Sequence, residues 1–421
     1  MTRVIEFLIS LVIVFLLFVL VGVFLPARRH VEHTQETNHP VRQVYDTINS
    51  FTRFGDWHPL RMHDPAVQYT LSGPPSGIGA KLDYVSQSKR VGSGSWEITN
   101  SEEDSQVEYS IQNSSRGKDK TSVITLDQHG KTVGIAWEYD VEYGWDLVGR
   151  YAGLYVSRTV GDDMKLGLGN LVGLLATMPN FDYSDITVST VAVQPQNILY
   201  VSTTADRNIT AVENAMILAL KDVRAAIAAN GLEAVSPPRL VTTNFGSEKY
   251  EFDVAIPVRR PVPGESAASE TPAEGEMPVD PAADTTTEPA AATDSTAEAA
   301  PATPESFTFE PAPAPLEGLK LPTNVLLGQG YAGVALSTDY QGHPAVLPLI
   351  RDKLRSYAAS HGLTIHDRTF EEYLTEITET AADEARFKVY WPIQHASNPV
   401  RPVAPAPTGA PTAEPAPSPG T

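Results

Sequence analysis

The chain opens with a long apolar run and then changes to short alternating patterns of apolar and polar residues. The run FLISLVIVFLLFVLVGVFL, residues 7–25, is 19 residues long and carries no charge. At about 1.5 Å per residue, a helix of this length approaches the ~30 Å hydrocarbon core of a bilayer. A cleaved signal peptide is the alternative, but its apolar core is usually only about 7–15 residues long. We therefore expect residues 1–29 to form a retained single-span membrane anchor.

The charges that flank this run do not fix the direction in which it crosses the membrane. Arg3 lies on one side, partly offset by Glu6, and Arg28 and Arg29 lie on the other. The positive-inside rule therefore gives no clear answer. The absence of cysteine and the Pro/Ala/Thr-rich segments favour the extracytoplasmic side for the rest of the chain. A cytoplasmic location is the alternative.

Residues 30–180 alternate short β-like runs with turn signals. The stretch TSVITLDQHGKTVGIAWEYDV, residues 121–141, predicts a hairpin that turns at His129-Gly130. Beyond it, apolar residues recur at helical spacing after Asp146, which is a candidate N-cap. An antiparallel sheet followed by a long helix predicts the α+β fold class.

This region resembles the START-like, or helix-grip, superfamily that includes the polyketide cyclase-like proteins. The residues that carry the resemblance are FGDWHP (54–59), GPPSGIGAKLDY (73–84) and GDDMKLGLGNL (161–171). The resemblance implies a curved sheet that grips a helix, with an apolar cavity between them for lipophilic ligands. It does not imply catalysis, because many members only bind. Three tryptophans are candidate ligand contacts, with core packing as the alternative: Trp57, Trp96 and Trp137.

Residues 183–258 and 316–395 look like one another. Each contains an amphipathic helix that ends at a glycine, Gly231 or Gly362, which indicates a matching C-cap. Each also ends in a similar strand, VAIPV in the first half and VYWPI in the second. We therefore predict an internal duplication in which each half reads strand, helix, extended segment and strand. The apolar helix positions that coincide are Met216 with Leu347, Ala219 with Ile350, Val223 with Leu354 and Ile227 with Ala358.

The two halves are separated by residues 259–315, a segment rich in Pro, Ala, Thr and Glu. Between Pro261 and Leu319 there are 12 acidic residues and no Lys or Arg. Such a composition has no core-forming periodicity and predicts a disordered spacer. Residues 396–421 have a similar low-complexity composition, which predicts a disordered tail.

The duplicated region resembles the GyrI-like, or AraC-type effector-binding, domain. The second half carries the resemblance best, in GYAGVALSTDYQGHP (330–344), FEEYL (370–374) and EARFKVYWPI (384–393). The resemblance implies a pseudo-twofold unit with an aromatic-lined cleft, where an acidic residue meets cationic, lipophilic ligands. Carried over to this chain, the acid is Glu371, with Tyr373 beside it. The other candidate ligand-binding residues are Tyr340, Tyr390 and Trp391.

Strand periodicity agrees with this choice of acid. In a strand over residues 370–374, alternation places Glu371 and Tyr373 on one face and Glu372 on the other. A carboxylate in an apolar cleft takes up a proton or attracts a cation, and aromatic faces attract cations too. The alternative is that both glutamates point to solvent. In the first half, Glu251 is the candidate second acid.

The composition excludes several classes of function. A formal net charge of −20 argues against a nucleic-acid partner, because such binding needs phosphate-neutralising Lys and Arg. No catalytic constellation, cofactor motif or metal motif is present; His58, His63 and Asp64 are a weak metal alternative to ordinary loop surface. The sequence therefore predicts a membrane-anchored protein that binds a lipophilic, cationic small molecule. The alternatives are a hydrolase or cyclase that uses a cleft glutamate, and a scaffold with filled clefts.

Overall fold

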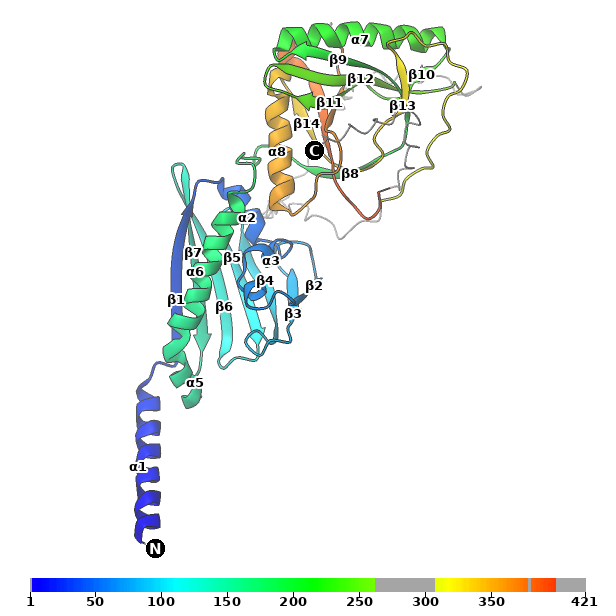
Figure 1. The fold of residues 1–421 in the computed structure, drawn as a ribbon. Helices are drawn as coiled ribbons and strands as arrows, with labels where there is room; N and C mark the ends of the chain where they lie inside the picture. Colours follow the sequence, from blue (N-terminus) through cyan, green and yellow to red (C-terminus); the bar gives the residue numbers. More distant parts are fainter. Residues whose placement is uncertain (1, 262–306, 378–379, 399–421) are drawn as a thin grey trace, which may run out of the picture.

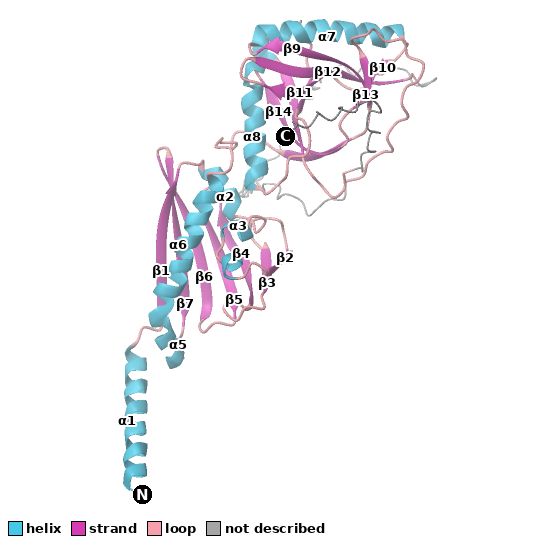
Figure 2. Cartoon of the chain, viewed as in Figure 1, coloured by secondary structure: helices cyan, strands magenta, loops and turns pink. Residues whose placement is uncertain are grey.

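The structure is a computed structural model that describes residues 2–261, 307–377 and 380–398 (Figures 1 and 2). The described chain comprises a long N-terminal helix and two sheets with their covering helices. Figure 1 shows helix α1 extending from one end of the first sheet domain, with the second sheet domain at the opposite end.

Helix α1 (Thr2–Phe24) contains the apolar run except for its last residue, Leu25. It ends just before Pro26, where the proline ring restricts the preceding residue to extended backbone. Among the described residues, α1 is the helix whose length and composition would allow it to cross a bilayer.

The first domain, here called the grip domain, is a seven-stranded antiparallel sheet in the order β1-β7-β6-β5-β4-β3-β2. The predicted hairpin is present as β6 and β7, and Gly130 in its turn has a φ of 64°. The sheet strands are β1 (Arg28–Thr37), β2 (Gln68–Ser72), β3 (Lys81–Val85), β4 (Ser93–Glu102), β5 (Gln106–Asn113), β6 (Lys118–His129) and β7 (Thr132–Glu142). The helices are α2 (Val41–Ile48), α3 (Phe54–Trp57), α4 (Leu60–His63), α5 (Leu147–Ala152), the 3-10 turn η1 (Gly153–Tyr155) and α6 (Val156–Leu175).

Helix α6 lies across the sheet, and two of its glycines explain how closely it approaches. A Cβ on Gly167 would come within 2.6 Å of the Trp137 ring, and one on Gly161 within 2.9 Å of the His33 ring. Gly169 and Gly173, by contrast, face open space. The predicted helix does begin at an Asp146 cap, whose carboxylate accepts a hydrogen bond from the Gly149 amide. It is not continuous, because η1 separates α5 from α6.

The second domain contains a nine-stranded sheet in the order β13-β9-β12-β11-β15-β16-β14-β8, and β10 pairs with β12 off this path. Its first half contains β8 (Ser189–Val193), β9 (Asn197–Asp206), α7 (Ile209–Ala229), β10 (Glu233–Ala234), β11 (Arg239–Phe245) and β12 (Lys249–Arg259). Its second half contains β13 (Leu326–Gln329), β14 (Gly333–Gln341), η2 (Pro344–Val346), α8 (Leu347–Ser360), β15 (Phe370–Tyr373), η3 (Ala382–Glu384) and β16 (Arg386–Pro392).

The element order and the strand pairing are the same in the two halves. In each half the strand that precedes the long helix pairs with the last strand, and the last strand pairs with the one before it in the sheet: β9-β12-β11 and β14-β16-β15. The halves join where β11 pairs with β15. Each leading strand is exchanged, because β8 precedes β9 but pairs with β14, and β13 precedes β14 but pairs with β9. The exchange links the two halves at both outer edges of the sheet.

The equivalent helices also end alike. Gly231 and Gly362 adopt φ angles of 59° and 70°, the left-handed region that terminates a helix. Of the eight helix residues predicted to coincide, seven are buried and Ile227 is half-buried.

The two domains meet where α2 of the grip domain lies beside the end of α8. The Tyr183 hydroxyl donates to the Asp46 carboxylate at 2.8 Å and contacts the Ser360 hydroxyl at 2.7 Å. Arg53 donates to the Ala359 carbonyl at 2.7 Å. The end of the second-half helix is therefore attached to the grip domain.

The predicted disordered segments fall mostly outside the described residues, which stop at 261 and 398 and resume at 307. Residues 307–315, at the end of the predicted spacer, correct the prediction of disorder, because they have a defined position. Phe307 and Phe309 pack against the apolar cluster of the second half. The Glu310 amide donates to the Gln194 side chain at 2.9 Å. Two aromatic residues and these backbone contacts hold a segment whose composition alone predicts disorder.

Candidate functional site

A large cavity lies on the helix-covered face of the second sheet. It is a cleft of about 600 Å³ to which α7, α8 and the ends of β11, β12 and β15 contribute. We call it the helix-side cleft. Its walls are mainly apolar and aromatic, and they include Val212, Met216, Ile217, Leu240, Phe245, Tyr250, Leu347, Leu349, Tyr373, Ile377 and Phe387.

A buried ion pair lies beneath this cleft. The Arg351 guanidinium, on α8, donates to the Glu371 carboxylate on β15, and its other nitrogen donates to the Tyr250 hydroxyl at 3.0 Å. Burial raises the pKa of Glu371, and the Arg351 charge opposes that rise. Burial likewise raises the pKa of Tyr250, to about 12, so its hydroxyl stays protonated at neutral pH. Arg351 therefore holds Glu371 and Tyr250 together at the base of the cleft.

The position of Glu371 corrects the role predicted for it. The residue is 0% exposed, and its charge is matched by Arg351. One of its oxygens, Oε2, is buried and has no hydrogen-bond partner among the described residues. Tyr373 does line the cleft, and its ring packs edge-on against Phe387 at 4.9 Å between centroids. The predicted pair therefore shares a face, but only the tyrosine reaches the open space.

A different carboxylate reaches the cleft. Glu213, on α7, is half-buried in its wall, and no ion pair or hydrogen bond to its side chain is found among the described residues. It lies close enough to Tyr373 to act on that hydroxyl electrostatically. Glu376 also lines the cleft, but Arg224 pairs with it at 2.6 Å. Arg207 lies at the wall with its guanidinium 4.1 Å from the centre of the Phe245 ring.

Glu372 lies on the opposite face of the same strand and forms a second buried ion pair. Arg239 on β11 pairs with it at 2.8 Å, and the Tyr390 hydroxyl donates to its other oxygen at 2.8 Å. Tyr390 stacks on Phe370 with 4.6 Å between ring centroids. Both glutamates of FEEYL are thus buried, which rules out the alternative that both point to solvent. Each is neutralised by an arginine from a neighbouring element.

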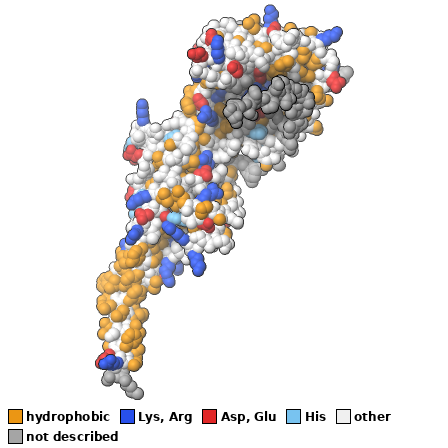
Figure 3. Space-filling model, viewed as in Figure 1, with side chains coloured by type: hydrophobic (Ala, Val, Ile, Leu, Met, Phe, Trp, Pro, Cys, Tyr) orange, Lys and Arg blue, Asp and Glu red, His pale blue; other side chains and the backbone are white. Residues whose placement is uncertain are grey.

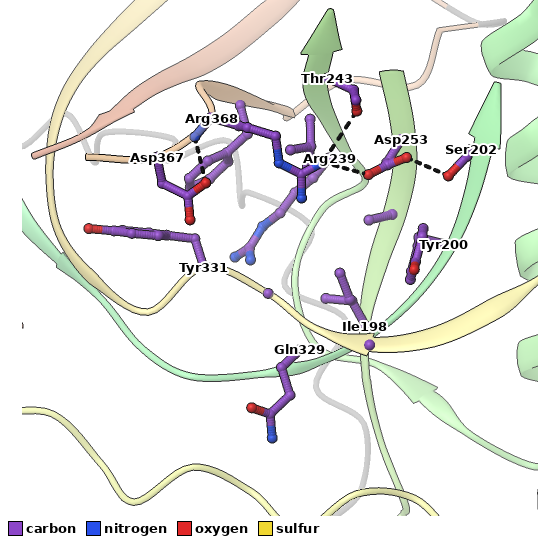
Figure 4. Close-up of a pocket in the computed structure, with 15 residues that line it drawn as sticks. Ile198, Tyr200, Ser202, Arg239, Thr243, Asp253, Gln329, Tyr331, Asp367 and Arg368 are labelled. Atoms are coloured by element: carbon purple, nitrogen blue, oxygen red, sulfur yellow. Dashed lines mark hydrogen bonds and ion pairs between the residues drawn. The ribbon is translucent and has the colours of Figure 1, made fainter. Parts of the chain in front are cut away.

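A second cavity of about 470 Å³ opens on this opposite face, and we call it the sheet-side pocket (Figure 4). Figure 4 shows Tyr331 and Tyr200 on its two sides, with Arg239 directed between them. Along one wall, Arg368 donates to Asp253 at 2.9 Å and to Thr243 at 3.2 Å, and Ser202 donates to Asp253 at 2.6 Å. The wall charges are therefore paired with one another.

Four other predicted site residues are not in the helix-side cleft. Tyr390 lies on the face of the sheet away from the helix-side cleft. Strand alternation places it on the other face from Val389 and its cross-strand partner Glu371. Trp391 and Tyr340 pack against the second-half core, where Tyr340 stacks on Phe387 at 6.0 Å. Glu251 is exposed on β12 and lines neither cavity. The candidate second acid of the first half therefore lies outside the helix-side cleft.

In the grip domain, aromatic side chains pack between the helix and the sheet. Trp57, Trp96 and Trp137 are 1%, 7% and 3% exposed, so all three are buried in the core of the grip domain. Trp57 and Trp137 pack edge-on with 5.6 Å between ring centroids. His58 is stacked on Phe54 at 4.2 Å, and burial lowers its pKa to about 3. His58 is thus a neutral core residue and not loop surface.

The weak metal alternative finds no support in this geometry. His63 pairs with Asp163 at 2.7 Å, Asp64 accepts a hydrogen bond from Ser86, and His58 is buried among aromatics. A different trio, His30, Glu138 and Asp140, has ligand atoms within 4.8 Å of one another. The hydrogen bond to Asp140 raises the pKa of His30, which favours an imidazolium–carboxylate pair over metal binding.

Comparison with known proteins supports the grip domain. Residues 28–176 match the family described as "Polyketide cyclase / dehydrase and lipid transport". The match, together with the curved antiparallel sheet and α6, shows an SRPBCC-like domain at these residues. This fold suggests a hydrophobic cavity for small molecules in general. No match was found among curated proteins.

Solved structures with similarity to this chain have low scores. Norcoclaurine synthase from Thalictrum flavum is 10% identical, with 35% of this chain and 95% of that chain covered and a TM-score of 0.28. The di-domain ARO/CYC StfQ of the steffimycin pathway is 9% identical, with 35% and 50% covered and a TM-score of 0.29. The EcmrR C-terminal domain is 9% identical, with 50% and 98% covered and a TM-score of 0.32. At these scores the three structures add no argument.

Sequence reasoning missed Arg351 and Glu213. A signal for Arg351 was present, because it and Leu220 each precede the helix-ending glycine by the same eleven positions. An arginine at a core position of an amphipathic helix calls for a buried partner. No local pattern distinguishes Glu213, whose place in the cleft depends on how α7 and α8 are arranged over the sheet.

Proposed function

We propose that the protein is a membrane-anchored binding protein for lipophilic, cationic small molecules, and that the helix-side cleft is its site. The single observation that carries this proposal is a cleft of about 600 Å³ with mainly apolar walls and one carboxylate, Glu213, without an ion-pair partner among the described residues. Such a volume is in the usual range for a drug-sized ligand.

The charges of the cleft support a role for Glu213 in place of Glu371. Arg351 neutralises Glu371, and Arg224 neutralises Glu376, so neither offers an unmatched negative charge. Glu213 does, and the aromatic faces of Tyr373, Tyr250 and Phe245 surround the same space. A cation above such rings is attracted by their negative faces. Arg207, which also lines the cleft, would instead favour an anionic ligand. The charge preference of binding is therefore a direct test of the proposal.

We further propose that residues 183–258 and 316–395 form a duplicated GyrI-like domain, with the second half continuing from the spacer. The shared element order, the exchanged leading strands and the matching glycine caps support this assignment. The grip domain of residues 30–180 then connects the anchor to the binding domain. A hydrolase that uses Glu371 receives no support, because that carboxylate is fully buried and ion-paired.

Membrane anchoring by α1 is part of the proposal. It is supported by the length and apolar composition of the helix. We place the soluble domains on the extracytoplasmic side, because the chain has no cysteine and carries Pro/Ala/Thr-rich segments.

The test compares two probes of the same shape and opposite charge. Isothermal titration with tetraphenylphosphonium and tetraphenylborate measures the charge preference of the full chain in detergent. We expect saturable binding with the cation favoured, and Glu213→Gln should weaken cation binding about tenfold, as for one lost interaction with a charged group. Glu251→Gln, an exposed acid outside both cavities, is the matched control. Equal affinity for both probes, unchanged by Glu213→Gln, would contradict the proposal.

A further inference from the structure

The segment that follows the grip sheet exposes large apolar side chains directly beside the end of α1. Trp145 is 82% exposed, Tyr155 65%, Leu154 50% and Val148 49%. A soluble surface rarely gathers such residues within one short segment. We call Trp145–Tyr155, which spans α5 and η1, the juxtamembrane segment.

This segment is attached to the last turns of α1. The Arg150 guanidinium donates to the Val23 carbonyl at 2.9 Å and to the Leu25 carbonyl at 3.2 Å, so it caps the C-terminus of the helix. The Tyr151 hydroxyl donates to the Phe18 carbonyl at 2.8 Å, and the two rings stack with 4.4 Å between centroids. Phe18 belongs to the apolar run, about 9 Å along the helix from its end at Phe24. Tyr151 therefore lies level with the final turns of a helix that has the composition of a membrane span.

The residues around this segment have the composition of a membrane interface. Tryptophan and tyrosine favour the headgroup level, where an apolar ring and a polar group both find partners. Lys118 and Arg158 are exposed, and no ion-pair partner for either is found among the described residues. The acid of the segment, Asp146, is paired with Arg116 at 3.1 Å. Figure 3 shows Lys and Arg side chains gathered where the apolar helix meets the grip domain.

We propose that the juxtamembrane segment docks into the headgroup region of the membrane that α1 crosses. Its occupant is the phospholipid interface, with Trp145 and Tyr155 inserted at the level of the ester groups and the basic residues near anionic headgroups. This inference rests on the proposed membrane anchoring of α1, because α1 fixes the depth of the segment. The consequence is that the grip domain is held against the bilayer instead of swinging on a free linker.

The absence of cysteine permits a direct test in the full chain. A single cysteine at each of four positions carries an environment-sensitive fluorophore, and the protein is reconstituted in phosphatidylcholine–phosphatidylglycerol nanodiscs. The variants are Trp145→Cys, Tyr155→Cys, Leu16→Cys within α1 and Lys131→Cys in the distal β6–β7 turn. β1 pairs with β7 over ten residues between Glu142 and Val133, so this turn is about 30 Å from the membrane end of the sheet.

Lipids with a nitroxide near the headgroup or deep in the acyl chain then quench fluorophores at matching depth. We expect positions 145 and 155 to be quenched most by the shallow nitroxide, position 16 most by the deep one, and position 131 by neither. Quenching at 16 without quenching at 145 and 155 would overturn the docking and leave the anchor intact. Blue-shifted but unquenched emission at 145 would assign the patch to a second copy of the chain. Failure of quenching at 16 would contradict the anchor itself, and the docking with it.

Discussion

The two halves of the second domain share their element order and strand register, yet they place opposite chemistry at equivalent positions. In the first half, Leu220 on α7 and Leu240 on β11 belong to one buried apolar cluster. In the second half the equivalent positions hold Arg351 and Glu371, which form a buried ion pair. Leu240 and Glu371 even pair directly across the junction of the two halves.

The difference shows that the fold does not need the charges, because the first half forms the same arrangement without them. What the ion pair adds is a contact between the halves. Arg351, from the second half, donates to the hydroxyl of Tyr250, from the first, and so positions a side chain that lines the helix-side cleft. We infer that the Arg351–Glu371 ion pair shapes the cleft. The proposed ligand-binding carboxylate is Glu213, not Glu371.

The sharpest way to break this comparison is to remove one charge of the pair. Glu371→Leu leaves Arg351 buried without a carboxylate and should destabilise the second domain by about 3–5 kcal/mol. Arg351→Leu combined with Glu371→Leu copies the first half and should be close to neutral, or stabilising by about 1–4 kcal/mol. Hydrogen exchange of β15 and β16 across a urea series reports on this domain separately. A double variant as unstable as the single one would contradict the account.

We expect the Arg239–Glu372 pair, on the opposite face of the sheet, to lose less stability when its carboxylate is removed. Glu372→Gln weakens the Arg239 contact, but Arg239 keeps its bond to Gln196 at 2.9 Å and lies in the wall of the open sheet-side pocket. We expect a loss of about 1.5–3 kcal/mol, the range for a hydrogen bond to a charged group. Tyr390→Phe removes a neutral donor to the Glu372 carboxylate and should cost about 1.5 kcal/mol, the lower end of the same range. The same exchange experiment measures both, and a loss at Glu372 larger than at Glu371 would reverse the predicted order.

The two helix-ending glycines have different surroundings, so substitutions at them also test the comparison between the two halves. In Gly231→Ala, the added Cβ has open space around it, but alanine must adopt a left-handed backbone conformation. We expect this to lower the free energy of unfolding by about 1–2 kcal/mol. Gly362→Ala carries the same conformational cost, and its Cβ would also come within 2.8 Å of Thr52 and 2.9 Å of Arg53 in the grip domain. We therefore expect Gly362→Ala to have the larger effect and to increase hydrogen exchange at the contact between α2 and α8. Equal effects at both sites would show that this contact adjusts freely.

The last stability prediction concerns pH. The pKa of Glu371 is raised in the folded protein by burial, so the folded state binds its proton more readily than the unfolded state does. Its contribution to stability is then fully present below the unfolded pKa of about 4.3 and is lost as pH rises. The stability advantage of the double leucine variant over the native chain should thus shrink as pH falls from 7 toward 4, by at most about 1.4 kcal/mol per unit. An advantage that grows on acidification would contradict the direction of the shift.

Sequence patterns predicted the elements better than the site. The hairpin turn at Gly130, the Asp146 cap and the glycine-terminated helices follow local rules, and each is present in the structure. Strand alternation also predicts that Glu371 and Tyr373 lie on the same face of β15. Which acid reaches the cleft could not be derived this way, because it depends on tertiary pairing. Arg351 covers Glu371 from a helix twenty residues away, whereas Glu213 comes from the other half.

The grip domain shows the same limit of local reasoning. A resemblance to ligand-binding folds predicts that its tryptophans line a cavity, whereas Trp57, His58 and Trp137 pack against one another. The volume left between a helix and a sheet depends on side chains from several elements. Gly167, for example, allows α6 to approach the Trp137 ring closely.

The central claim is that Glu213 meets the ligand and the Arg351–Glu371 pair only shapes the cleft. The most direct test is the affinity for tetraphenylphosphonium of three proteins: the native chain, Glu213→Gln, and the double variant Arg351→Leu with Glu371→Leu. We predict that Glu213→Gln weakens binding about tenfold. The double variant, which keeps its core apolar, should stay within about threefold of the native chain, less than one lost charged contact. Binding that survives Glu213→Gln but disappears in the double variant would return the anchor to Glu371 and contradict the account.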